Sequence, residues 1–187
     1  MKRTFIAVKI PVESELDLML NKFRKVLENE KIKWVKPDNF HITLYFLGNT
    51  EEKLIDPISK EIMNITNKNH SFSLTLSGVG VFKSIYSPKV LWIGIEDYFQ
   101  LRNIKNDIDR SLESFGFVSD NREFKPHLTF GRPKWILEKN KLKDLLIRYQ
   151  NQFFQKTEVK EIIFFESKLT KKGPVYNIIS KCSLLQV

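Results

Sequence analysis

The chain has 187 residues, of which 42% are hydrophobic and 28% are charged. This much apolar material excludes a disordered protein and suits a single two-lobed domain spanning residues 1–187. The net charge of +9 would attract a polyanion such as a nucleic acid, although the same excess can serve solubility alone.

Hydrophobic periodicity predicts strands and helices in alternation through the first half of the chain. In chain order, the pattern predicts a buried strand over residues 5–10, a helix over 14–27 and a strand over 41–47. A second helix is expected to begin at an N-cap, Thr50, and to run through residue 65. Two more strands are predicted over 72–81 and 90–96.

The same order of elements returns in the second half. A helix is predicted over residues 98–115, a strand over 126–131, a helix over 137–149 and a strand over 159–166. A last strand over 175–180 follows a turn at Gly173-Pro174.

The two halves are related by a nearly constant offset. His41 and His127 lie 86 residues apart, and the first strands, near Arg3 and Val90, lie 87 apart. Because little residue identity accompanies the offset, it indicates a structural duplication rather than a sequence repeat. We therefore expect a bilobal α+β fold with two pseudo-symmetric lobes. Each lobe would have an antiparallel sheet and helices outside, with a central cleft between the sheets.

Cys182 is the only cysteine, which excludes an intramolecular disulfide and a cysteine-based zinc site. The first apolar run is interrupted by Lys9 and Pro11 and is too short for a signal peptide. No run approaches the roughly 20 apolar residues of a membrane span. We expect a cytoplasmic monomer with no membrane partner.

Two of the three histidines are followed at the second position by threonine, in His41-Ile42-Thr43 and His127-Leu128-Thr129. One such motif is weak support for function, but a pair at matching places in a duplicated chain is much stronger. Side chains at i and i+2 of a strand point to the same face, about 6.6–7 Å apart. Each motif therefore offers an imidazole and a hydroxyl in one direction.

Two such strands converging across a pseudo-dyad would suit one phosphodiester. The threonines would hydrogen-bond the non-bridging oxygens, and the imidazoles would lie on either side of the phosphorus. Histidine serves proton transfer in both directions because its ordinary pKa, about 6.5, is close to working pH.

Two other interpretations remain open for the motif histidines. A histidine on a strand is often a hydrogen-bonded core residue. A metal site would require a third ligand, and neither motif carries a carboxylate at ligand spacing. The third histidine, His70, is expected in a solvated loop. The sequence thus predicts no metal and no cofactor.

Arg132 and Tyr45 are candidate substrate-binding residues. Strict alternation points Arg132 away from His127 unless the strand bends or bulges at Gly131; with a bulge, the guanidinium could hold a phosphate. Tyr45 shares the face of His41 by alternation, so it could line the cleft. Trp34 and Trp92 could stack on a base, although interior packing is their default role.

The chain resembles the two-histidine phosphoesterase superfamily. Within it, the chain is most similar to the RNA 2',3'-cyclic phosphodiesterases, also called LigT-like or 2'-5' RNA ligases. Residues 34–48, around His41, resemble the first motif block of that family, and residues 124–132, around His127, resemble the second. Residues 3–11, 90–92, 167–169 and 173–176 resemble its other strands, so the similarity spans essentially the whole chain.

The resemblance implies hydrolysis of a terminal 2',3'-cyclic phosphate of RNA, or of a cyclic nucleotide, to a 2'-phosphate without a metal. It implies that His41 is the proton donor to the departing 3'-oxygen and that His127 is the proton acceptor from water. Thr43 and Thr129 would hold the phosphoryl oxygens, and Arg132 matches a basic position that is frequent after the second motif.

Two alternatives to the hydrolase remain. A 2',5'-specific RNA ligase would use the same chemistry in reverse, so the motifs cannot separate the two. A non-catalytic protein that binds RNA ends or nucleotides is the other, and it would be favoured if a motif histidine or threonine were missing.

Overall fold

The computed structural model describes residues 1–118, 123–171 and 173–186. Short 3₁₀ helices, η1 (Pro37–Asn39) and η2 (Glu52–Leu54), precede β3 and α2 in the following list. In chain order, the strands and α-helices are β1 (Lys2–Lys9), α1 (Ser14–Val26), β2 (Lys31–Trp34), β3 (His41–Thr50), α2 (Ile55–Thr66), β4 (Phe72–Phe82), β5 (Val90–Glu96), α3 (Phe99–Glu113), β6 (His127–Trp135), α4 (Lys139–Tyr149), β7 (Phe153–Val159), β8 (Glu161–Thr170) and β9 (Gly173–Ser183).

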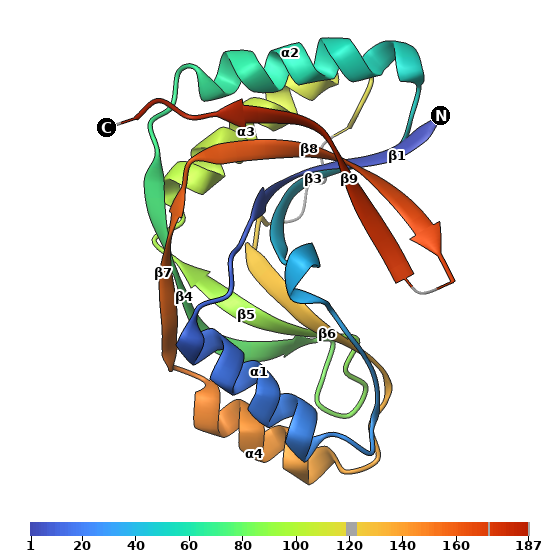
Figure 1. Ribbon diagram of the computed structural model, residues 1–187, viewed down its shortest axis with the longest axis vertical. Coiled ribbons are helices and arrows are strands. Elements are labelled where there is room, and N and C mark those ends of the chain that lie inside the picture. The colour runs from blue at the N-terminus through green and yellow to red at the C-terminus, as the bar shows by residue number, and fades with distance from the viewer. Residues whose placement is uncertain (119–122, 172, 187) are drawn as a thin grey trace.

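The strands form two antiparallel sheets. One sheet has four strands in the order β3-β1-β8-β9, and the other has five in the order β2-β6-β5-β4-β7. Figure 1 shows α2 and α3 together beside the four-stranded sheet, and α1 and α4 beside the five-stranded sheet. We call each sheet with its two helices a lobe, and the sheet face opposite its helices the inner face. The prediction of a bilobal α+β fold with antiparallel sheets is confirmed.

Apolar stripes attach the helices to the outer faces of the sheets. Helix α3 buries four residues at helical spacing, Leu101, Ile104, Ile108 and Leu112, each at most 1% exposed. These residues lie within the helix predicted over residues 98–115. Burying a leucine or isoleucine side chain contributes about 1.5–3 kcal/mol, so one such stripe is enough to fix the helix on its sheet.

The lobes do not coincide with the two halves of the sequence. Strand β8 of the second half pairs with β1, and β4 of the first half pairs with β5. Helix α3 packs beside α2, and α1 contacts β7. Each half thus contributes a strand and a helix to both lobes. Phe23 of α1 and Ile58 of α2 belong to one cluster of buried hydrophobic residues.

The structure corrects three details of the predicted elements. Thr50 is not an N-cap: it is the last residue of β3, pairs with Lys2, and shares a buried hydroxyl–hydroxyl bond of 2.7 Å with Thr4. Strands β2 and β7 were not predicted, and both lie at edges of the five-stranded sheet. The sequence Lys-Ile-Lys-Trp of β2 alternates polar and apolar residues, but four residues are too few for this alternation to predict a strand.

The inner face of the four-stranded sheet carries a small aromatic cluster. Phe5, Ala7, Ile163 and Phe165 are buried there, and Tyr176 packs against them. Within the described ranges, no helix is long and apolar enough to cross a membrane.

Candidate active site

Strands β3 and β6 lie in different sheets and contact each other, which brings the two His-x-Thr motifs together. On both strands the histidine and the threonine are half-buried, whereas the residue between them, Ile42 or Leu128, is fully buried. The predicted alternation therefore holds over both motifs. Each motif presents its imidazole and hydroxyl on the inner face.

The two imidazoles are held in the same way. Nδ1 of His41 lies 2.7 Å from the carbonyl oxygen of Asn39, and Nδ1 of His127 lies 2.9 Å from that of Lys125. A carbonyl oxygen can only accept, so Nδ1–H donates in both rings. This leaves Nε2 of each ring without a proton in the neutral form, and it is the nitrogen available for proton transfer.

An edge-on aromatic ring packs against each histidine. Tyr176 lies against His41, with ring centroids 5.2 Å apart at an interplanar angle of 88°, and Phe82 lies against His127 at 4.7 Å and 88°. Phe5 also packs on His41 at 5.0 Å. No sequence signal indicated that these three rings contact the histidines. Tyr176 stood in a matching strand block, but nothing in that block indicated contact with a histidine.

A β-bulge follows each motif at the same position. On β3, Ala7 pairs with Thr43 while the preceding Ile6 pairs with Tyr45, so Leu44 is extra. On β6, Trp92 pairs with Thr129 while Leu91 pairs with Gly131. Phe130 is the matching extra residue. A bulge of one residue reverses the alternation beyond it.

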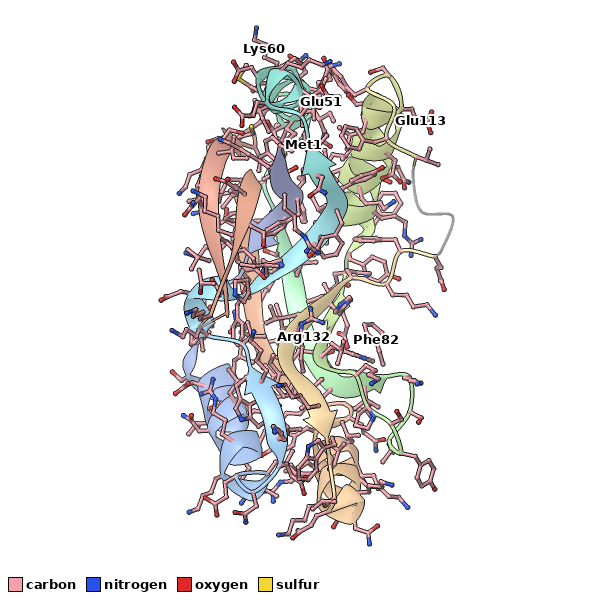
Figure 2. All side chains as sticks on the ribbon, turned by 90° about the vertical axis from the view of Figure 1, so that its right-hand side faces the viewer. Met1, Glu51, Lys60, Phe82, Glu113 and Arg132 are labelled. Carbon is pink, nitrogen blue, oxygen red and sulfur yellow. The ribbon has the colours of Figure 1, made fainter. Side chains whose placement is uncertain are left out.

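The bulge on β6 brings Arg132 back to the face of His127, because Phe130 and Gly131 are both buried and Arg132 is exposed. The sequence had left open whether a bend or bulge at Gly131 would turn Arg132 to this face. Figure 2 shows Arg132 midway along the molecule, where the lobes meet. Within the part of the chain that the structure describes, no carboxylate forms an ion pair with its guanidinium.

The bulge on β3 has the opposite effect on Tyr45. Its predicted place on the face of His41 was wrong, because the extra residue turns the ring to the buried side, where it is 8% exposed. The Tyr45 hydroxyl donates to the carbonyl oxygen of Val118 at 3.0 Å. Burial, followed by the charges of Asp109 and Glu113 on α3, raises the pKa of Tyr45. Phe46 takes the inner-face position instead and is 71% exposed.

The pKa values of both histidines lie below the usual 6.5. Burial is the largest cause for each ring, and the backbone hydrogen bond at Nδ1 partly opposes it. The charge of Arg132 lowers both pKa values further, and His127 adds to the effect on His41. In the free site, both rings are therefore mainly neutral at neutral pH, and the negative charge of a bound phosphate would favour protonation of one of them.

The threonine hydroxyls complete the arrangement. In the described ranges, neither the Thr43 nor the Thr129 hydroxyl has a hydrogen-bond partner, so both hydroxyls can donate to a ligand. No group of three or more His, Cys, Asp or Glu side chains among these residues could hold a metal ion. His70 is exposed, away from the site, as predicted. Two imidazoles, two hydroxyls and one guanidinium thus share the place where β3 meets β6.

Comparison with known proteins identifies the family. The model of the LigT-like phosphoesterase family matches residues 8–92 and residues 93–176, once in each half of the duplicated chain. The chain belongs to the LigT-like phosphoesterase family. As a LigT-like phosphoesterase it is an enzyme, a hydrolase of phosphoester bonds.

Two curated relatives of this LigT-like phosphoesterase are named RNA 2',3'-cyclic phosphodiesterase. The protein from Methanocaldococcus jannaschii is 35% identical over 179 residues, covering 96% of this chain and 99% of the relative. The protein from Archaeoglobus fulgidus is 34% identical, covering 93% and 96%. A crystal structure of a protein from Thermus thermophilus superposes with a TM-score of 0.80 at 25% identity and covers 97% of both chains.

Proposed function

We propose that this chain hydrolyses the 2',3'-cyclic phosphate at the end of an RNA, or of a cyclic nucleotide, to a 2'-phosphate. The main support for the proposal is that both imidazoles are held in the same way. In each ring, Nδ1–H donates to the backbone carbonyl two residues earlier. Only the Nε2 atoms are then free, and one phosphate between them would have a proton acceptor on one side and a donor on the other. The curated relatives are named RNA 2',3'-cyclic phosphodiesterases, which supports this substrate.

The proposed reaction is a direct in-line displacement at phosphorus. Nε2 of His127 removes a proton from water while the water oxygen bonds to phosphorus. The bond from phosphorus to the 3'-oxygen breaks, and protonated Nε2 of His41 gives that oxygen its proton. Thr43 and Thr129 donate to the non-bridging oxygens, and Arg132 balances the charge that develops there. No metal or cofactor takes part in this scheme.

Turnover in the presence of a chelator tests the metal-free scheme. An oligoribonucleotide ending in a 2',3'-cyclic phosphate is incubated with the protein in excess EDTA, and the products are separated. We expect undiminished turnover to a 2'-phosphate. Loss of activity in EDTA would rule out metal independence, and a 3'-phosphate product would show that the acid and base act on the wrong oxygen.

The same assay distinguishes the two alternatives. A second RNA with a 5'-hydroxyl is added, and a joined 2',5'-product would show the ligase direction. Binding without any turnover would favour the non-catalytic RNA-end binder. We further propose that the active species is a monomer in the cytoplasm, which sedimentation and cell fractionation would test.

The charge of Arg132 should set the pH range of the reaction. The rate requires one neutral and one protonated histidine, so kcat/KM should follow a bell-shaped curve against pH. Replacing Arg132 with glutamine removes a charge that lowers both histidine pKa values, so both limbs of the bell should move to higher pH. Arg132→Lys is the matched control because it keeps the charge. A lower maximum of kcat/KM with no shift of the curve along the pH axis would contradict this electrostatic role.

A further inference from the structure

The inner face of the five-stranded sheet holds a pocket that the proposed reaction does not use. Its volume is about 440 Å³, and its lining includes Ser77, Gly78, Trp92, Gly94, Glu96 and Gln150. The pocket lies over β4 and β5, with the segment after α4 at its edge. A space of this size holds a nucleobase with room for solvent.

Strand register places the pocket beside the candidate active site. Gly94 is the Cα partner of His127, and Trp92 is the partner of Thr129. Paired residues of an antiparallel ladder have Cα atoms about 4.5–5.5 Å apart. The pocket therefore begins one strand away from the imidazole that we propose as the base. A single nucleotide could therefore place its phosphate at the imidazole and its base in the pocket.

Glycines keep the floor of the pocket open. A Cβ atom on Gly94 would lie 2.7 Å from the carbonyl oxygen of Ser77, and one on Gly80 would lie 2.2 Å from Cζ2 of Trp92. Only glycine at position 80 allows the indole to lie along β4. The residues present thus leave a flat aromatic wall next to an uncovered stretch of sheet.

The indole of Trp92 is positioned by packing alone. Its ring lies 5.4 Å from that of Phe82, which in turn packs on His127. Within the described residues, Trp92 Nε1 is buried and has no hydrogen-bond partner. The half-buried indole lines the pocket, where a base can stack beside it, and such stacking tolerates any base.

The rim of the pocket carries a negatively charged side chain rather than a positively charged one. Ser77 donates its hydroxyl hydrogen to Glu96, and the Glu96 side chain is exposed with no cation paired to it among the described residues. A carboxylate repels phosphate, so the backbone of an RNA is a poor occupant. It accepts two hydrogens well, and guanine offers two adjacent donors, N1–H and the 2-amino group, on its Watson–Crick edge.

We propose that this pocket binds the base of the nucleoside that carries the cyclic phosphate. Trp92 provides the stacking wall, and Glu96 accepts hydrogens from a base edge with an amino group, which favours guanine over uracil. The inference rests on the proposed function for its choice of ligand. It adds base selection to a site whose catalytic groups contact only the phosphate.

Binding of the product nucleotides tests this pocket without requiring turnover. Affinities of 2'-GMP and 2'-UMP are measured by calorimetric titration of the whole protein. We expect 2'-GMP to bind more tightly, and Glu96→Gln to weaken 2'-GMP by roughly tenfold to a hundredfold while 2'-UMP changes less than about twofold. Trp92→Leu should weaken both nucleotides by about tenfold or more and keep their ratio.

Glu158→Gln is the matched control, since this exposed carboxylate lies on β7 of the same sheet and pairs with Lys160. It should leave both affinities unchanged. Equal affinities in the unmodified protein, or an equal loss of both nucleotides in Glu96→Gln, would overturn the base assignment. Failure of the proposed function has a separate signature, which is the absence of cyclic-phosphate turnover whatever the binding ratio.

Discussion

Replacement of either motif histidine by alanine is expected to lower kcat by about 10²–10⁴-fold, the usual contribution of one general acid or base. Each Nε2 is the only group that the proposed scheme offers for its proton transfer. The two losses should not multiply in the double variant, because both rings act in one step. Steady-state hydrolysis of a cyclic-phosphate-ended oligoribonucleotide measures the effect.

His70→Ala is the matched control for these variants, because the third histidine is exposed and distant from β3 and β6. It should keep full activity, and all three variants should melt near the unmodified protein. Near-normal turnover in His41→Ala or His127→Ala would refute the paired mechanism.

A substrate with a better leaving group separates the acid from the base. An aryl phosphodiester releases a phenolate that needs little protonation, so it should restore much of the rate of His41→Ala. His127→Ala should remain impaired, because water still needs a base. The reverse pattern would exchange the roles of the two histidines.

Thr43→Val and Thr129→Val should each lower kcat by about 10²–10³-fold with a small change in KM. Valine keeps the shape of threonine but cannot donate to a phosphoryl oxygen, and losing one donor at a developing oxyanion has this magnitude. Single-turnover hydrolysis provides the measurement.

Thr43→Ser and Thr129→Ser should recover most of the rate because serine retains the hydroxyl. Thr66→Val is the control on the outer helix α2, where the hydroxyl donates to the carbonyl oxygen of Met63 at 3.1 Å. A higher KM with an unchanged kcat in the valine variants would show that the threonines contribute only to ground-state binding.

Sequence patterns predicted the elements that bury an apolar stripe, because burial is what makes a pattern visible. All four α-helices and the two motif strands were predicted from the sequence, although the second helix was given an incorrect N-cap, Thr50. The exchange of β4 and β8 between lobes could not be predicted in this way. Strand order depends on long-range pairing, and the periodicity of a strand does not depend on which sheet it enters.

The bulges explain why the candidate site was predicted only in part. The four motif residues precede the bulges, so simple alternation places them correctly. Arg132 and Tyr45 follow the bulges, where alternation fails by one residue. Gly131 gave a hint on β6, since glycine often marks a bulge. The extra Leu44 on β3 carries no such signal, and Tyr45 was misplaced for that reason.

The two bulges also give the site a direction. Five residues after each histidine, matching positions hold a phenyl ring, Phe46, on one strand and a guanidinium, Arg132, on the other. A receptor with perfect twofold symmetry would accept a phosphodiester in two opposed orientations, one of which presents the leaving oxygen to the wrong imidazole. An apolar ring opposite a cation makes those two orientations unequal in energy. The duplicated strands could thus become a one-way catalyst through a difference at a single pair of equivalent positions.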